Sequence, residues 1–311
     1  KSGVRLLVSR GASDCYRPCD EVFEGSVWMR ALRAFLFNVL FFAGTTALCI
    51  CMLPLMPCGR KANQLVGHMW CHLTQGALAI SVGMYKRIRG LENLPKGPCI
   101  LVAKHQSAWE TLTFHTVVPD PAYILKKELT RIPLMGQFLL FSGQIAVDRS
   151  AGSSALKDMI KGAERALEDG RQIVIFPEGT RTPPGSDRPY HPGIYALYKA
   201  FPNTPVIPVA INSGMFWGRH SFMKYGGEVT MEFLPAIEPD LDRKTFMKTI
   251  KSRIDDRTRE LEREAQAEFN LPTLTSRDVE IEEAREKAEA EQQEAKTAIP
   301  MKSVNQEKTP S

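Results

Sequence analysis

The sequence lacks several features that would assign it to common protein classes. No cysteine follows Cys99, and the seven cysteines are odd in number, so most of the chain cannot belong to a secreted disulfide framework. There is no G-x-S-x-G nucleophile elbow, no phosphate-binding P-loop and no dinucleotide-binding glycine pattern. These absences argue against serine hydrolases, P-loop enzymes and dinucleotide-dependent dehydrogenases, and the cysteine usage is typical of a reduced, cytoplasmic environment.

Side chains with metal-ligand spacing are also scarce. Cys15 and Cys19 have a metal-like spacing but no second pair, and His68 and His72 lie four residues apart without a third ligand. We interpret the two cysteines as thiols of a flexible terminus and the two histidines as one polar face of a helix. The sequence therefore predicts no metal site.

Charge is distributed unevenly along the chain. The net charge is +5, but residues 277–311 contain six basic and nine acidic side chains, so the rest of the chain carries +8. A basic body suits an anionic partner such as a phospholipid surface, a phosphorylated substrate or a nucleic acid. No cluster of basic and aromatic residues typical of nucleic-acid binding is present, so we expect no nucleic-acid partner.

A stretch without any charge occupies residues 34–56, between Arg33 and Arg60. At about 1.5 Å per helical residue, it can cross a hydrocarbon core of about 30 Å. It lacks a clean cleavage site for a signal peptidase, so we predict a membrane-associated helix rather than a signal peptide or a buried core helix. A second helix is predicted at 63–84, because apolar residues recur there every three or four positions. These residues form one stripe: Leu65, Met69, Leu73, Ala77, Ile80 and Met84.

The two segments together predict a membrane-anchoring helical pair over 29–84. The pair could be a hairpin within one leaflet, or a span followed by an interfacial helix. Residues 1–28 show no clear period, and Met29 leads directly into the apolar segment. We therefore predict a poorly structured N-terminal extension at 1–28 and a natural translation start at Met29.

From residue 85 onwards, short β-rich runs alternate with helical stretches. This pattern predicts an α/β domain over 85–270, with a largely parallel central sheet flanked by helices. Residues 271–311 are rich in Glu, Ala and Lys without an apolar face, so they are predicted to form a charged, flexible tail. The expected strands are 85–89, 99–103, 122–125, 144–147, 172–176, 205–210 and 228–233, and the expected helices are 107–117, 153–169, 192–200 and 242–268.

The clearest candidate for catalysis follows the predicted strand 99–103. His105 would lie in the turn at the carboxyl end of that strand, where α/β folds place their sites. A neutral imidazole can accept a proton from a hydroxyl group. A carboxylate bound to its other nitrogen makes the imidazole a better base, because it fixes the tautomer and stabilises the imidazolium. Glu110 can supply this carboxylate if His105 lies in the turn and Glu110 lies in the first turns of the following helix. The alternative is a surface histidine beside an unrelated glutamate.

A second candidate segment, Phe-Pro-Glu-Gly-Thr-Arg at 176–181, follows the predicted strand 172–176. Gly179 permits close approach of the backbone to a ligand. Thr180 and Arg181 offer hydrogen-bond donors suited to a phosphate, and the guanidinium can bind it through two parallel bonds. An ordinary turn between a strand and a loop has a similar composition and is the alternative.

Taken together and in this order, the motifs resemble those of the 1-acylglycerol-3-phosphate acyltransferases, a family of the glycerolipid acyltransferase superfamily. The family's H-x4-D motif is matched by His105 with Glu110 in place of the aspartate, and its F-P-E-G-T-R motif is matched in full by residues 176–181. The resemblance extends over about 85–235. Its other two motifs resemble residues 126–133 with Gly136 and 143–149, and residues 206–210.

The resemblance implies a membrane enzyme of phospholipid biosynthesis, in the inner or plasma membrane with its active site facing the cytoplasm. An acyl group would pass from acyl-CoA or an acyl-acyl carrier protein to the sn-2 hydroxyl of lysophosphatidic acid, giving phosphatidic acid without an acyl-enzyme, a metal or a cofactor. His105 would be the general base, oriented by Glu110. The phosphate would be bound by Glu178, Gly179, Thr180 and Arg181, with Lys126 and Arg149. Lys127 is the alternative to Lys126, and a plain surface charge is the alternative for Arg149. An acyltransferase of the same superfamily acting on another lysolipid is the alternative.

Two positions depart from the family pattern. Glu110 is one methylene longer than the usual aspartate, so its helix should lie slightly farther from the imidazole. His191 occupies a position where the family often has lysine, so any cationic role there would depend on pH.

Overall fold

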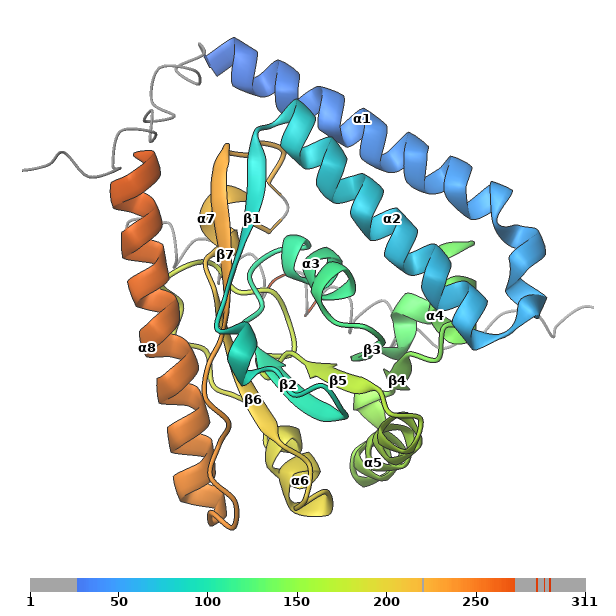
Figure 1. The fold of residues 1–311 in the computed structure, drawn as a ribbon, viewed down its shortest axis with the longest axis vertical. Helices are drawn as coiled ribbons and strands as arrows, with labels where there is room; N and C mark the ends of the chain where they lie inside the picture. Colours follow the sequence, from blue (N-terminus) through green and yellow to red (C-terminus); the bar gives the residue numbers. More distant parts are fainter. Residues whose placement is uncertain (1–26, 220, 272–283, 285–287, 289–290, 292–311) are drawn as a thin grey trace, which may run out of the picture.

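The computed structural model describes residues 27–219 and 221–271, together with residues 284, 288 and 291. The predicted extension 1–28 therefore lies almost entirely outside the described residues, and so does most of the predicted tail 271–311. The described part contains a seven-stranded sheet with helices on both faces and a helical pair across one side (Figure 1). This confirms the predicted α/β class.

The sheet is largely parallel, as predicted. The strands lie in the order β1-β7-β6-β2-β5-β3-β4. Every neighbouring pair is parallel except β6 and β7, so β1 and β7 run against the other five strands. The strands are β1 (Met84–Arg89), β2 (Cys99–Ala103), β3 (Pro121–Lys126), β4 (Ile145–Val147), β5 (Gln172–Ile175), β6 (Val206–Ile211) and β7 (Gly227–Phe233).

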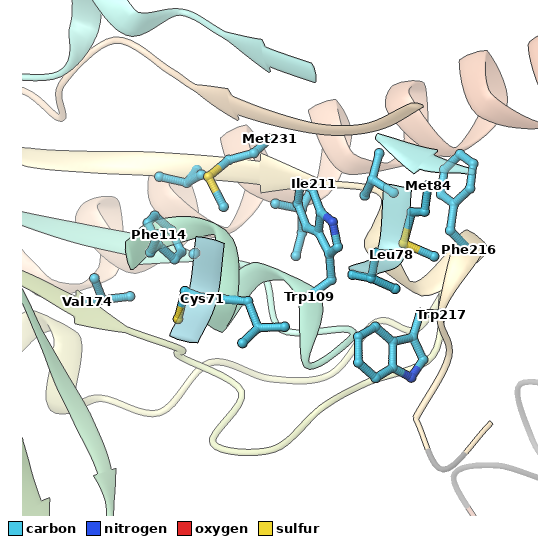
Figure 2. Close-up of a cluster of buried hydrophobic side chains, with 14 of the residues drawn as sticks. Cys71, Leu78, Met84, Trp109, Phe114, Val174, Ile211, Phe216, Trp217 and Met231 are labelled. Carbon is cyan, nitrogen blue, oxygen red and sulfur yellow. The ribbon is translucent and has the colours of Figure 1, made fainter. Parts of the chain in front are cut away.

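The central strands are buried on both faces, which explains their continuous apolar sequences. Successive residues of a strand point to opposite faces, so Leu101 and Val174 enter one core while Ile100 and Ile173 enter the other. Figure 2 shows the first core, where Trp109 is fully buried. The helices on the sheet are α3 (Trp109–Val117), α4 (Met135–Phe141), α5 (Ser153–Glu168), α6 (Gly193–Ala200), α7 (Ser213–Phe216) and α8 (Arg243–Phe269).

Helix α1 (Val27–Cys51) contains most of the predicted apolar segment, and Trp28–Cys51 is long and apolar enough to cross a membrane. It begins earlier and ends earlier than the predicted 34–56. The 3-10 helix η2 (Leu53–Cys58), which contains two prolines, replaces the expected end of the helix because proline cannot continue an α-helical hydrogen-bond ladder.

Helix α2 (Arg60–Ser81) runs back beside α1 and packs on α3 (Figure 1). Three residues of its predicted apolar stripe, Leu65, Leu73 and Ile80, face away from the core and are 62% to 90% exposed. The helix ends before the predicted residue 84, and Met84, the last residue of that stripe, is buried in β1. The buried face instead includes polar side chains such as Gln64 and Gln75. An outward apolar stripe of this kind indicates a surface suited to lipid rather than to water.

Candidate active site

Three neighbouring parallel strands, β6, β2 and β5, end at one edge of the sheet. The segments that follow β6, β2 and β5 begin at Asn212, Lys104 and Phe176, respectively. Open α/β sheets bind ligands at this carboxyl edge. The two sequence motifs therefore meet here because their strands are hydrogen-bonded neighbours.

His105 and Glu110 form the contact that the sequence predicts. His105 lies in the turn after β2, and Glu110 lies in the first turn of α3. The His105 Nδ1 atom is 2.7 Å from the Glu110 Oε1 atom. This contact fixes Nδ1 as the protonated nitrogen when the imidazole is neutral, which leaves Nε2 as the proton acceptor.

The Glu110 carboxylate is fully buried and its oxygens are held by several donors. The backbone N–H groups of Gln106 and Ser107 each donate to Oε1 at 2.8 Å. Ser213 donates its hydroxyl to Oε2 at 2.7 Å. The longer glutamate thus reaches the imidazole while its carboxylate also fixes the turn that carries His105.

Sequence reasoning did not identify Ser213. Its position offers a signal, since Asn212 and Ser213 directly follow the buried strand β6 at the same edge of the sheet. A polar pair in that place is a sequence signal for a residue of the site. Its contact with Glu110 joins residues that lie 103 positions apart in the chain.

The imidazole of His105 stacks on the ring of Phe176, with centroids 4.0 Å apart and planes 15° apart. Its side chain is 17% exposed, so it is accessible from one direction. Among the residues that the structure describes, none bonds to its Nε2 atom. Phe176, the first residue of the second motif, therefore contacts the face of the His105 ring.

A buried ion network lies beneath the turn. The Lys104 ammonium is 3.1 Å from Glu178 and 2.9 Å from Asp255 of α8, and all three side chains are at most 3% exposed. Burial opposes its charged form, yet the two carboxylates hold the pKa of Lys104 above its usual value. Tyr190 donates its hydroxyl to Asp255 at 2.9 Å.

Glu178 belongs to this network rather than to the surface. It accepts from the backbone N–H of His105 at 3.2 Å, and burial raises its pKa against the opposing charge of Lys104. Thr182 fixes the same turn, since its backbone N–H donates to the His105 carbonyl at 2.7 Å. The geometry favours a positioning task for Glu178, and its predicted contact with a phosphate stays untested.

Helix α8 makes a second contact with the turn. Gln106 donates to Glu262 at 2.6 Å, and the Gly214 N–H donates to the Gln106 side chain at 3.2 Å. The residues on both sides of His105 are therefore bound to α8, through Asp255 and Glu262. No sequence motif marked these two acids, which lie seven residues apart on a helix rich in charge.

The remaining predicted phosphate-binding residues form an open cationic rim. Gly179 has a φ of +73°, a left-handed conformation that favours glycine, and it lies against the guanidinium of Arg149. Arg149 donates to the Gly179 carbonyl at 2.6 Å. Thr180 and Arg181 follow in the same loop and are partly exposed.

Two further rim positions complete the arrangement. Lys126 is exposed at the end of β3, beside the end of β4 that precedes Arg149. His191 lies against Gly179, and burial together with Arg149 and Arg188 lowers its pKa. The imidazole of His191 is therefore neutral at pH 7, unlike the lysine that the family often has.

Of the two histidines with metal-ligand spacing, His72 is exposed and His68 has other contacts. His68 faces the carbonyl oxygens of His115 and Pro119 through its two ring nitrogens. Within 27–219 and 221–271, no group of three or more His, Cys, Asp or Glu side chains could hold a metal ion. Cys15 and Cys19 lie outside the described residues.

An apolar cavity of about 90 Å³ lies between α1, α2 and α4. His115, on its wall, is neutral because burial, with His68 and Arg171, lowers its pKa to about 3. A row of aromatic rings connects this wall to the site: His115 contacts Tyr123, which stacks with Phe176 beneath His105. The cavity is therefore a neighbour of the site rather than part of it.

Comparisons with known proteins agree with this arrangement. Residues 86–212 match the family model described as Acyltransferase. The chain is 34% identical to a 1-acyl-sn-glycerol-3-phosphate acyltransferase of Pseudomonas aeruginosa over 217 residues, which are 68% of this chain and 83% of that protein. It is 29% identical to the human 1-acyl-sn-glycerol-3-phosphate acyltransferase beta over 142 residues, 45% of this chain and about half (51%) of that protein.

A solved structure has a similar fold. The crystal structure of the 1-acyl-sn-glycerophosphate acyltransferase from Thermotoga maritima superposes with a TM-score of 0.56 at 22% identity. The match covers 76% of this chain and 95% of that chain. At this identity the likeness shows a shared fold.

Proposed function

The chain belongs to the 1-acyl-sn-glycerol-3-phosphate acyltransferase family, and we propose that it transfers an acyl group from an acyl thioester to the sn-2 hydroxyl of 1-acylglycerol-3-phosphate. The product would be phosphatidic acid. The acyl donor would be acyl-CoA or an acyl-acyl carrier protein, in keeping with the family resemblance. The outward apolar faces of α1 and α2 suit an enzyme whose acceptor and product are membrane lipids.

In the proposed reaction, the Nε2 atom of His105 accepts the proton of the acceptor hydroxyl as its oxygen attacks the thioester carbonyl. The carbon–sulfur bond then breaks, and the imidazolium returns the proton to the departing thiolate. Glu110 stabilises the imidazolium through Nδ1. No acyl-enzyme is formed, because the attacking oxygen belongs to the substrate.

We assign the acceptor phosphate to the cationic rim. Arg149 and Arg181 would supply charge, and Thr180 would supply a hydroxyl donor beside Gly179. Lys126 lies farther along the same edge and would contact the headgroup from the side of β3. Glu178 is better suited to hold Lys104 and the backbone of His105, because a buried carboxylate would repel a phosphate.

The observation that carries this proposal is the 2.7 Å contact between His105 and Glu110 beside the loop of residues 176–181. It is tested by incubating purified protein with several lysolipids and with both donor types. We expect transfer to lysophosphatidic acid to exceed transfer to lysophosphatidylcholine or an amino-acid lysolipid. Preference for an acceptor without a terminal phosphate would contradict the proposal and favour another lysolipid acyltransferase.

The general base is tested by His105→Ala, with His72→Ala of the exposed face of α2 as the matched histidine control. We expect His105→Ala to lower kcat by about 10³-fold or more while membrane binding is kept. The control should retain activity close to that of the wild type. Turnover of His105→Ala within a few-fold of the wild type would remove His105 from the role of base.

A further inference from the structure

A second apolar surface lies on the crossover between β3 and β4. It consists of the 3-10 helix η4 (Lys127–Arg131), the turn that follows it and α4. Proteins in water seldom expose many large apolar side chains within one short segment without a partner. Five of them are 36% to 49% exposed here: Leu129, Ile132, Met135, Leu140 and Phe141.

This crossover segment, residues 127–141, is a built structure. The Gly136 N–H donates to the Ile132 carbonyl at 2.8 Å, and a Cβ at Gly136 would lie 2.2 Å from the Thr130 carbonyl oxygen. Leu134 has a φ of +63°, a conformation that a leucine rarely adopts without support from its surroundings. The segment is thus folded into a shape that presents apolar side chains outward.

The segment adjoins the end of the membrane-associated helix. Phe138 and Leu139 of α4 line the apolar cavity together with Leu48 of α1. Just after α4, the backbone at Gly143 lies against the side chain of Arg60, the first residue of α2. The exposed Leu53 and Leu55 of η2 lie between α1 and Arg60, so apolar exposure continues from α1 to α4.

The charges around the crossover segment complement an anionic surface. Lys126, Lys127 and Arg131 are exposed and basic, whereas the nearby acids are Glu128, which is exposed, and Asp148, which lies 3.4 Å from Lys127. Basic residues beside exposed Leu and Phe side chains are typical of segments that lie in a membrane interface. Helix α8 differs, since its outer face carries charges of both signs and no large exposed apolar side chain among the described residues.

We propose that residues 127–141 form a second membrane-contacting surface for an anionic phospholipid leaflet. Leu140 and Phe141 enter the acyl-chain region, while Lys127 and Arg131 bind headgroup phosphates. The segment begins at the carboxyl end of β3 and ends beside the start of α2, so it connects the edge that carries His105 with the membrane-associated helices. On the proposed function, this contact holds the acceptor site at the surface where a lysolipid resides.

An acidic acyl carrier protein is the competing partner for a basic patch. Binding of an acidic protein to this patch would depend mainly on charge. The patch also exposes five large apolar side chains and lies beside α1, and these features favour a membrane leaflet over an acidic protein as its partner. The two partners are separated by direct binding measurements that need no turnover. Failure of the surface and failure of the proposed reaction are therefore distinguishable.

The direct test uses Phe141→Trp in the full chain with vesicles of phosphatidylglycerol and phosphatidylcholine whose acyl chains carry bromine. After subtraction of the wild-type signal, we expect the added emission to shift to the blue and to be quenched by about half or more. The matched control is Leu91→Trp, since Leu91 is 51% exposed on η3 (Leu91–Asn93), which packs on β7 toward the other edge of the sheet. Its added emission should not be quenched. Equal quenching of the added emission at both positions by the brominated lipids overturns the proposal. A change in the added emission at position 141 with acyl carrier protein but not with vesicles overturns it as well.

A kinetic test uses Leu140→Gln and Phe141→Gln with two acceptors, a long-chain lysolipid in vesicles and a short-chain, water-soluble analogue. We expect the vesicle concentration at half-maximal rate to rise by about fivefold for each, because a half-buried leucine or phenylalanine loses apolar contact with lipid. The kinetics with the soluble analogue should not change. Equal losses with both acceptors, or no loss with either, overturn the proposal.

Discussion

The two sides of the turn that carries His105 differ in how completely their polar groups are bound. Beneath it, Lys104, Glu178 and Asp255 are at most 3% exposed, and Lys104 bonds to both carboxylates. On the other side, the rim around Gly179 presents Arg149 and His191 to solvent. The buried network holds the turn of His105 in place, whereas the rim is open to a ligand.

This difference predicts two kinds of defect. Removing a group from the buried side leaves a charge or a donor without its partner in a low-dielectric place, which is costly. Removing a group from the rim costs a contact with the ligand and little else. Changes beneath the turn should therefore alter kcat or stability, and changes at the rim should alter the KM of the acceptor.

The largest effect is expected for Glu110→Gln. The amide oxygen can still accept from the backbone of Gln106 and Ser107, so the shape of the turn is kept while the charge that stabilises the imidazolium is lost. We expect kcat to fall by about 10³-fold with little change in the KM of the acceptor. Steady-state kinetics with both substrates varied would measure the split.

The control for that variant is Glu110→Asp, which installs the residue that the family usually has. It keeps the charge and shortens the side chain by one methylene, so we expect a loss of less than about tenfold. Similar losses for the two variants would mean that the length of Glu110, rather than its charge, supports His105.

The next largest effect is expected for Asp255→Asn. This change leaves Lys104 with one carboxylate and should destabilise the fold by about 3 kcal/mol, which lowers Tm by roughly 6 to 12 °C. Asp256→Asn is the matched control, because Asp256 is 64% exposed and pairs at the surface with Arg259. Thermal unfolding in one detergent would compare the two. Equal shifts in Tm would contradict the structural role of the buried network.

A smaller effect is expected at the rim for Arg149→Gln. Loss of a charge-assisted contact should raise the KM of the phosphate-bearing acceptor by about 10- to 100-fold and leave the KM of the acyl donor nearly unchanged. Arg165→Gln, an exposed change on α5, serves as the control. An equal rise in both KM values would remove Arg149 from the phosphate site.

The smallest effect is expected for His191→Lys. Burial, Arg149 and Arg188 lower the pKa of His191, so the wild-type imidazole is neutral at pH 7.5 and gains charge only as the pH falls through that lowered pKa. Lysine is charged over this whole range, so the acceptor KM at pH 7.5 should fall by about two- to fivefold. The advantage should narrow toward acid pH. A constant ratio between the two proteins at every pH would show that His191 does not titrate beside the phosphate.

The sequence was sufficient for the features that depend on local pattern. All seven expected strands are observed, and the central ones, β2, β5 and β6, are buried and have continuous apolar sequences that stand out between polar turns. The contact between His105 and Glu110 could be predicted because one turn and one helix of nine residues determine it. The sequence of residues 176–181 likewise marked the loop at the rim.

The parts that could not be predicted depend on tertiary contacts. Nothing near Asp255 or Glu262 in the sequence indicates that they hold the turn of His105 from a helix more than a hundred residues away. The burial of Glu178 could not be read from its motif, and its predicted contact with a phosphate stays a prediction. Similarly, the apolar stripe of α2 indicated a helix, but its direction follows from the packing of Gln75 on Thr113.

The pairing of β1 with β7 has a consequence for synthesis of the protein on the ribosome. Strand β1 pairs with β7, which is synthesised much later. In the same region, Asn93 bonds to Phe233, which lies 140 residues farther along the chain. At about 5 to 20 residues per second, β1 waits roughly 7 to 28 s for its neighbour, while α1 and α2 are already complete. An unpaired strand is an aggregation hazard during such a delay, and three of the six residues of β1 are basic: Lys86, Arg87 and Arg89. These charges keep the waiting strand soluble until β7 emerges and closes the sheet.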